Sequence, residues 1–288
     1  MISLFLAEWQ KIAGHRWASG FLIWLFPIGI TVIVAISILT ALFSPNTIQI
    51  LGLSTAKWTD QMINIWGITS NTLGRLLLMG FTAIIFGGEY QWQTWKNIIP
   101  YRQRASLIFT KFVALGAFVT IAFATTSIIW GIGVSIVVSI SGEANTPTLT
   151  GNMLTNFLAN YTLTAISAFI SVMISAGYAA LGALLTRSVV GAALVGFIVT
   201  IMEEISIAIF LLIQRLTNIQ PVVNLYRLTP TFNLRNVGSW INNGNPFLLQ
   251  GLDFPPANLY FSMVVLLVWV FGLILLTTLL FKRQDITS

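Results

Sequence analysis

Residues 259–281 read LYFSMVVLLVWVFGLILLTTLLF, an apolar stretch without a charge, and Lys282 and Arg283 follow it directly. A stretch of this length is long enough to cross the ~30 Å hydrocarbon core of a bilayer as a helix. The whole chain shares this character, since 56% of its 288 residues are hydrophobic, 8% are charged and the mean hydropathy is +0.87. A soluble domain carries about a quarter charged residues, so the composition predicts a membrane protein.

Charged residues separate further apolar stretches upstream of this one. The sequence predicts spans at residues 17–43, 63–88, 107–140, 154–185, 189–213 and 259–281. The expected fold class is all-α, a polytopic membrane protein with six transmembrane helices in one domain, 1–288. We expect Pro27 to kink the first span. The loop 214–256 is rich in asparagine and proline, and its apolar residues predict short outer helices before the last span.

The basic residues predict the orientation, because they favour the cytoplasmic side of a membrane. With the N-terminus inside, the inner side receives nine: Lys11, Arg16, Lys96, Arg102, Arg104, Lys111, Arg187, Lys282 and Arg283. The outer side receives four: Lys57, Arg215, Arg227 and Arg235. We therefore expect both termini in the cytoplasm. The net charge of +6 follows this asymmetry and does not call for a nucleic-acid partner.

Several kinds of chemistry lack the residues they need. The chain has no cysteine, and its one histidine is His15, which argues against thiolate or multi-histidine metal sites and against a Ser/His/Asp triad. No G-x-x-x-x-G-K-[ST] phosphate loop occurs, so ATP binding by that route is not expected. We therefore predict no catalytic residue, no metal and no cofactor on this chain.

The fourth predicted span carries a stripe of small residues, spaced four apart: Ser167, Ser171, Ser175, Ala179 and Ala183. Such a pattern lets helix backbones approach closely in lipid. The alternatives are packing within the chain and a contact between two copies, and we favour the first.

The loop between the second and third spans is the most informative segment. Residues 88–104 read GEYQWQTWKNIIPYRQR, with aromatic and polar side chains alternating before Pro100. This pattern predicts a short helix at 89–98 lying at the membrane interface, with its rings at headgroup depth. A basic interfacial anchor is the simpler reading of the same residues.

The loop resembles that of ABC-2 type permeases, which have the type V exporter fold. That family shows a glutamate, a threonine, a proline, an arginine and a lysine in this order, and the matching residues are Glu89, Thr94, Pro100, Arg104 and Lys111. The glycine that often precedes the threonine is Gln93 here. Residues 8–11, Glu-Trp-Gln-Lys, are similar to the family's amphipathic elbow helix, expected at 2–15.

The resemblance implies that the loop is a coupling helix, which docks on a separate ATPase subunit and transmits its motion. The residues implied in coupling are Glu89, Tyr90, Trp92, Thr94, Trp95, Lys96 and Asn97. ATP and Mg would then bind to the partner. The resemblance also implies a homodimer with two ATPase subunits in a prokaryotic inner (plasma) membrane, closest to permeases that export peptide toxins, bacteriocins or drugs.

Three charges fall at bilayer depth: Arg75, Glu203 and Glu204. An isolated charge at that depth costs ~2.5–3.5 kcal/mol on insertion scales, so each needs a partner or a wet cavity. Arg75 and Glu203 both lie roughly 20 Å from the inner ends of their spans, at 1.5 Å per residue. This depth allows Arg75 to pair with one of the two glutamates, Glu203 or Glu204, or to face the pathway. A substrate pathway and a structural ion pair remain equal alternatives. Neighbouring glutamates point about 100° apart, which leaves one of them for a cationic or amphipathic substrate.

The favoured function is the permease of an ATP-driven exporter of an amphipathic substrate, with a peptide toxin or bacteriocin first. Export of lipids or small-molecule drugs is the alternative. A secondary transporter is disfavoured because no inverted repeat is visible. An intramembrane enzyme is disfavoured because only Glu203 and Glu204 offer paired acids.

Overall fold

The computed structural model describes residues 2–15, 20, 23–44, 57–98, 103–142, 144, 146–217, 220–248 and 256–284, apart from the side chains of residues 97, 98 and 220–223. These residues form α1 (Ile2–Gly14), α2 (Leu25–Phe43), α4 (Trp58–Gly67), α5 (Thr72–Gln91), α6 (Trp95–Ile98), α7 (Arg104–Ile140), α8 (Gly151–Thr186), α9 (Val189–Thr217), the 3₁₀ helix η3 (Gln220–Leu228), α10 (Pro230–Asn243) and α11 (Leu259–Arg283). Within them, six helices are long and apolar enough to cross a membrane: α2, α5, α7, α8, α9 and α11. The all-α, six-span fold class is confirmed.

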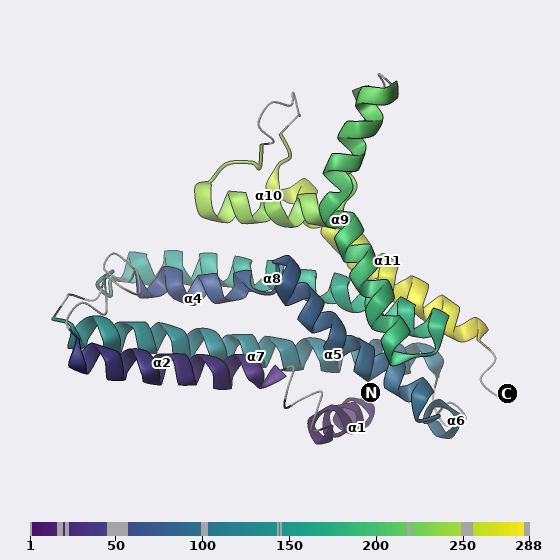
Figure 1. Ribbon diagram of the computed structural model, residues 1–288, viewed down its shortest axis with the longest axis horizontal. Coiled ribbons are helices and arrows are strands. Elements are labelled where there is room, and N and C mark those ends of the chain that lie inside the picture. The colour runs from purple at the N-terminus through teal and green to yellow at the C-terminus, as the bar shows by residue number, and fades with distance from the viewer. Residues whose placement is uncertain are drawn as a thin grey trace.

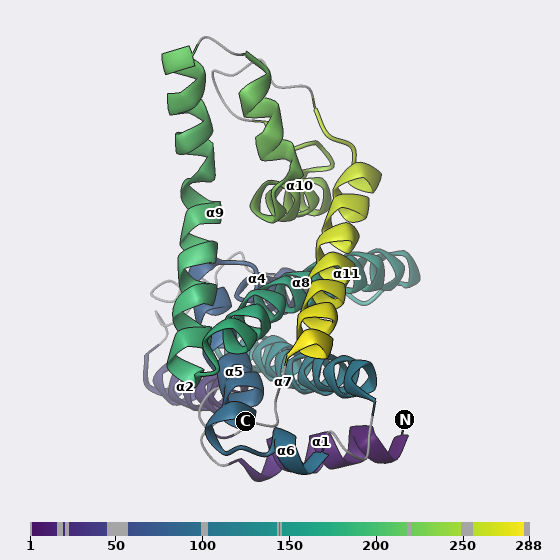
Figure 2. The same ribbon diagram turned by 90° about the vertical axis from the view of Figure 1, so that its right-hand side faces the viewer.

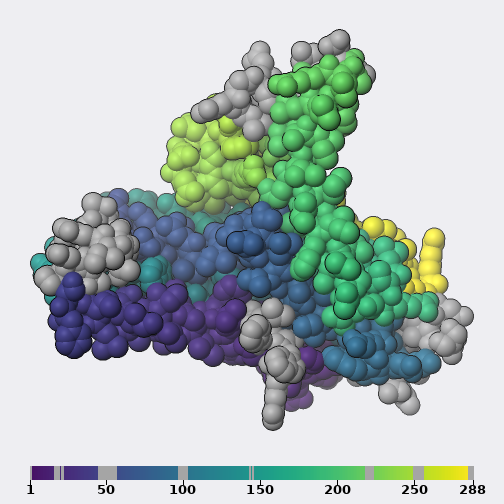
Figure 3. Space-filling model, viewed as in Figure 1, coloured from purple at the N-terminus to yellow at the C-terminus, as the bar shows by residue number. Residues whose placement is uncertain are grey.

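Two bundles diverge from a common inner region. Figure 1 shows α2, α4, α7 and α8 running side by side, whereas α9 rises steeply away from them with α10 beside it. Figure 2, turned by 90°, places α1 and α6 together at one side of the molecule and α10 between the far ends of α9 and α11. In the space-filling view the outer part of α9 projects beyond the body (Figure 3). The loop after the fifth span therefore contributes η3 and α10, which pack against the membrane helices.

The core lies around α8. Of the hydrophobic window of α8, 83% is buried, against 17% for α2 and for α9, whose apolar side chains face outward. The small-residue stripe is part of this core, with Ser167 at 6% exposure and Ser171, Ser175, Ala179 and Ala183 at 0%. The Ser171 hydroxyl donates to the Thr69 carbonyl, 3.0 Å away. The stripe is therefore used for packing within the chain, the alternative that the sequence favours.

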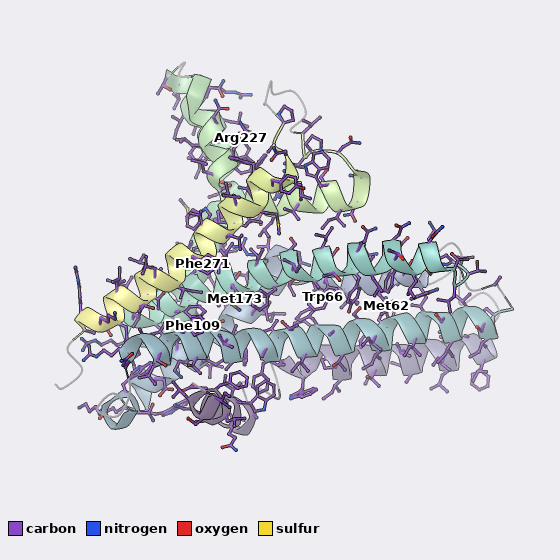
Figure 4. The ribbon with its side chains drawn as sticks, turned by 180° about the vertical axis from the view of Figure 1, so that it is seen from behind. Met62, Trp66, Phe109, Met173, Arg227 and Phe271 are labelled. Carbon is purple, nitrogen blue, oxygen red and sulfur yellow. The ribbon has the colours of Figure 1, made fainter. Side chains whose placement is uncertain are left out.

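Aromatic side chains fill the space between the long helices. Met62 and Trp66 of α4 point between the ribbons of α7 and α8 (Figure 4), and Trp66 is 3% exposed. Phe109 of α7 and Phe271 of α11 are 48% and 66% exposed instead. Large apolar side chains exposed on long apolar helices are what a lipid environment accommodates.

The second span is broken, which corrects the prediction of one helix over 63–88. α4 ends at Gly67 and α5 begins at Thr72. The polar run Thr69–Asn71 supplies the break: Asn71 Oδ1 accepts from the Gly74 amide at 2.8 Å, and the Thr69 hydroxyl donates to the Trp66 carbonyl at 2.8 Å. A side-chain cap satisfies an amide that would otherwise be unpaired at a helix start.

The first span also differs from its prediction. The start of that span lies outside the described residues, and the α-helix α2 begins at Leu25. Pro27 consequently lies in the first turn, where its missing amide proton is not needed, and it does not kink the interior of α2.

The break between α4 and α5 leaves no room for a side chain at Gly74. A Cβ on Gly74 would lie 1.7 Å from the Ile68 carbonyl oxygen, whereas a Cβ on Gly80 meets nothing within 4 Å. We expect Gly74→Ala to lower the stability by about 1–3 kcal/mol, as overpacking does. Gly80→Ala in the same helix is expected to be neutral or stabilising, because alanine is the better helix former. Thermal unfolding of the purified variants measures both, and equal melting temperatures for the two would contradict the requirement.

Candidate functional site

The turn between α5 and α6 is held by local hydrogen bonds. The Trp92 amide donates to the Gly88 carbonyl at 2.9 Å, and the Thr94 amide donates to the Glu89 carbonyl at 3.0 Å. The Thr94 hydroxyl also donates to the Glu89 carboxylate. Gln93 has a φ of +53°, the left-handed region that favours glycine. The position at which the resembling family often has glycine is therefore one whose backbone suits glycine.

A cluster of four charges anchors this turn, and we call it the inner charge cluster: Glu8, Glu89 and Lys111, which are buried, and Lys11, which is exposed. Lys111 Nζ lies 2.5 Å from Glu89 Oε1 and 2.8 Å from Glu8 Oε2. Lys11 forms an ion pair with Glu89 as well. The side chains of Glu89 and Lys111 are each 1% exposed. Two acids and two bases leave the cluster neutral, which is the condition under which charges tolerate burial.

The aromatic residues of the loop divide into buried and exposed ones. Trp95 is 2% exposed, its ring centroid lies 4.5 Å from that of Phe281, and Lys111 Nζ lies 5.3 Å from it. Trp92 is 51% exposed and Lys96 is exposed. Trp95 therefore attaches α6 to the membrane helices, while Trp92 and Lys96 remain accessible.

The last turn of α11 is clamped to the same region. Arg104 Nη1 donates to the carbonyls of Phe281, Lys282 and Gln284 at 3.0, 3.0 and 2.7 Å. Unpaired carbonyls at a helix C-terminus favour a cation in this position. The Tyr90 hydroxyl donates to Gln284 Oε1 at 2.5 Å. Of the predicted coupling residues, Asn97 lies in α6 and its side chain is outside the described part of the chain.

A second group of polar residues lies inside the membrane helices, and we call it the membrane ion pair: Arg75 and Glu203. Arg75 Nη2 lies 2.8 Å from Glu203 Oε2, with side chains 1% and 10% exposed. Arg75 Nε donates to the Ser175 hydroxyl at 3.1 Å. Tyr178 donates to Glu203 Oε1, and the Thr231 hydroxyl donates to Oε2 at 3.2 Å. The pair joins α5, α8 and α9 to the start of α10.

Glu204 has a different partner from its neighbour. The sequence predicts that one glutamate is left for substrate, but Arg235 Nη2 of α10 lies 2.6 Å from Glu204 Oε2. Adjacent residues on a helix point about 100° apart, so Glu203 reaches Arg75 of α5 and Glu204 reaches Arg235 of α10. The side chains of Arg235 and Glu204 are 45% and 21% exposed, so this pair is far less enclosed than the membrane ion pair.

Sequence reasoning missed Tyr178 and Thr231. A signal for Tyr178 exists, because it lies three positions after Ser175 and so on the same face of α8 as the small-residue stripe. No comparable signal marks Thr231. Its contact with Glu203 depends on how α10 folds back onto α9.

The fold and the two clusters define a class: a multi-pass membrane protein whose polar groups hold helices together at an inner turn and at mid-membrane depth. Among curated protein sequences, none matches the chain. The family model described as ABC-2 family transporter protein matches residues 100–286. The chain belongs to this family, whose members are the transmembrane components of ABC transporters. The match begins after Glu89 and Thr94 and includes Arg104 and Lys111.

Proposed function

We propose that this chain is the permease of an ATP-driven exporter, working as a homodimer with two separate ATPase subunits. The proposal rests on one observation: the α5–α6 turn has buried side chains that attach it to the membrane helices and exposed side chains that a partner could contact. Glu89 and Trp95 are buried, whereas Trp92 is 51% exposed and Lys96 is exposed beside it. A rigid turn that presents an aromatic and a cationic side chain suits docking into a groove of another protein.

The basic residues support the orientation that this proposal needs. The excess of lysine and arginine on one side supports a cytoplasmic location of both termini and of the α5–α6 turn. An ATPase subunit in the cytoplasm would then meet α6. The prokaryotic inner membrane remains part of the same proposal.

The proposed substrate is amphipathic, with a peptide toxin or bacteriocin first. A specific observation favours the alternative of a lipid or a small-molecule drug. Within the described residues, each glutamate already has an arginine partner: Glu203 pairs with Arg75, and Glu204 pairs with Arg235. A cationic peptide would have to displace an arginine to reach either glutamate. ATPase stimulation of the purified complex by a cationic peptide and by dispersed phospholipid distinguishes the two substrates.

The docking turn gives a direct test of the ATPase partnership. Tagged permease is purified from its native membranes, and we expect a chain with nucleotide-binding motifs to co-purify and to hydrolyse ATP. Replacing both Trp92 and Lys96 with alanine is expected to weaken ATPase capture about tenfold, since a hot-spot aromatic residue contributes more than 1 kcal/mol. The melting temperature is expected to stay unchanged, because both side chains are accessible. Quantitative pull-down and thermal unfolding measure the two effects.

The matched control is Asp60→Asn, which removes an exposed charge from α4. This variant is expected to capture the ATPase as the wild type does. A wild-type permease that captures no ATPase, together with reconstituted flux that ignores ATP, would overturn the proposed function and favour a secondary transporter.

A further inference from the structure

The inner charge cluster contains a lysine that joins four helices. Lys111 belongs to α7, its ammonium contacts Glu8 of α1 and Glu89 of α5, and it lies 5.3 Å from the ring of Trp95 in α6. Its side chain is 1% exposed. A buried cation of this kind requires its anionic partners, because an unpaired charge at such a site costs several kcal/mol.

The helix α1 is attached to the body by this cluster and by a few apolar side chains, among them Ile12 and Trp9. Its buried residues are Glu8 and Ile12, whereas Ile2 and Leu6 are 79% and 51% exposed. Trp9 adds one attachment to α7, stacking on Phe118 with 4.0 Å between ring centroids. Two of the attachments of α1 are therefore ion pairs, from Glu8 to Lys111 and from Lys11 to Glu89.

The space beside the cluster supports the same conclusion. A small pocket lies between α1 and α5, bordered by Ile12, Ile84 and Trp92 as well as by the four charges. Apolar packing is incomplete where a pocket remains, so the charges carry more of the contact between these helices. Moving α1 away would separate Glu8 from Lys111 and leave the lysine with one carboxylate.

We propose that Lys111 is a positioning residue that fixes α1 and the α5–α6 turn as one unit. Lys111 acts through Glu89, whose carboxylate and carbonyl both hold Thr94 in the turn. The helix α1 is then part of the device that passes motion from the ATPase, although Trp92 and Lys96 make the docking contact. The role in coupling rests on the proposed function, whereas the mechanical link between α1 and the turn does not.

Amide hydrogen exchange of the permease alone, in nanodiscs, tests the link. In Glu8→Gln we expect the amides of residues 2–14 and 92–98 to exchange about tenfold faster than in the wild type, because the lysine loses one of two carboxylates. The amides of residues 167–183 in α8 are expected to be unchanged. The conservative variant Glu8→Asp keeps the carboxylate that faces Lys111, and we expect exchange at 92–98 to stay slower than in Glu8→Gln.

The outcomes separate a positioning role from general stabilisation. Faster exchange in α8 as well as in 92–98 would mean that Glu8→Gln loosens the whole fold, and this would overturn the proposal. Unchanged exchange at 92–98 in both Glu8→Gln and Lys111→Met would overturn it too. Asp60→Asn serves as the control, since its exposed carboxylate lies on α4, away from the inner charge cluster.

The amount of substrate moved per ATP hydrolysed tests whether the link between α1 and the α5–α6 turn contributes to coupling. With the captured ATPase in proteoliposomes, Glu8→Gln is expected to lower the substrate moved per ATP hydrolysed by about tenfold, with ATPase capture unchanged, because Trp92 and Lys96 are intact. A ratio in Glu8→Asp closer to the wild type than in Glu8→Gln supports the positioning role. A normal ratio in Glu8→Gln, with faster exchange at 92–98, would overturn the coupling role. If the wild type captures no ATPase, the proposed function is overturned. The hydrogen-exchange result on the permease alone is unaffected by that outcome.

Discussion

Glu203→Gln is expected to destabilise the permease by about 3–5 kcal/mol, the cost of removing one partner from a buried ion pair. The amide keeps the shape of the carboxylate but has one acceptor oxygen, so it can accept from Tyr178 or from Thr231 and not from both. Arg75, 1% exposed, is left as a buried cation with the Ser175 hydroxyl as its remaining partner among the described contacts. Thermal unfolding of the detergent-purified protein and the yield of folded protein measure the loss.

The double variant Arg75→Met with Glu203→Met distinguishes the two roles of the membrane ion pair. Replacing a buried pair by apolar residues of similar size is often neutral or stabilising by about 1–4 kcal/mol, so we expect the melting temperature to recover. Both side chains are buried within one chain, which favours the structural alternative, and transport per assembled complex is then expected to be normal. A double variant that assembles but does not transport would instead place the pair on the substrate pathway.

Trp95→Ala is expected to detach α6 from the membrane helices. Truncating a buried tryptophan costs about 3–5 kcal/mol, and here the lost contacts are those with Phe281, Tyr90 and Lys111. Because α6 has four residues, it has little stability of its own once this side chain is gone. We expect a lower melting temperature of the permease. We also expect that the activity of the proposed ATPase subunit no longer depends on substrate.

Trp95→Phe is the matched control for this prediction. Trp95 Nε1 is buried and has no hydrogen-bond partner in the described structure, so phenylalanine loses ring area but no hydrogen bond. We expect a cost below about 1.5 kcal/mol, as for other conservative core replacements, and preserved coupling. If Trp95→Phe were as damaging as Trp95→Ala, the indole nitrogen would have a role that packing does not explain.

Much of the helical layout follows from the sequence because lipid imposes strong local rules. A long apolar run in lipid must be helical to satisfy its own backbone, so the predicted spans 107–140 and 154–185 fall within α7 and α8. The break after Gly67 was less accessible to such reasoning. Thr69, Ser70 and Asn71 mark it, but polar residues inside a span predict either a break or an interhelical hydrogen bond.

The candidate sites show the same division. Counting residues along two spans predicted that Arg75 and Glu203 lie at similar depth, and the structure places them 2.8 Å apart. The same counting gave no partner for Glu204. Its partner Arg235 lies in α10, and the path of the chain between α9 and α10 does not follow from helical periodicity. The alternation of aromatics predicted one interfacial helix at 89–98, which was wrong: α5 ends at Gln91, a turn follows, and α6 is Trp95–Ile98. Nor did it indicate that Trp95 is buried and Trp92 exposed.

The sequence by itself determined six helices that are long and apolar enough to cross a membrane. It also determined that the few charges within them need partners, because the cost of an unpaired charge in lipid is local to the residue. The tertiary structure alone decided which partners they take. Glu8, Lys11, Glu89 and Lys111 come from three separate helices, and Thr231 reaches Glu203 only because α10 folds back onto α9. Pairing between distant segments depends on the packing of whole helices, and no local pattern in the chain records it.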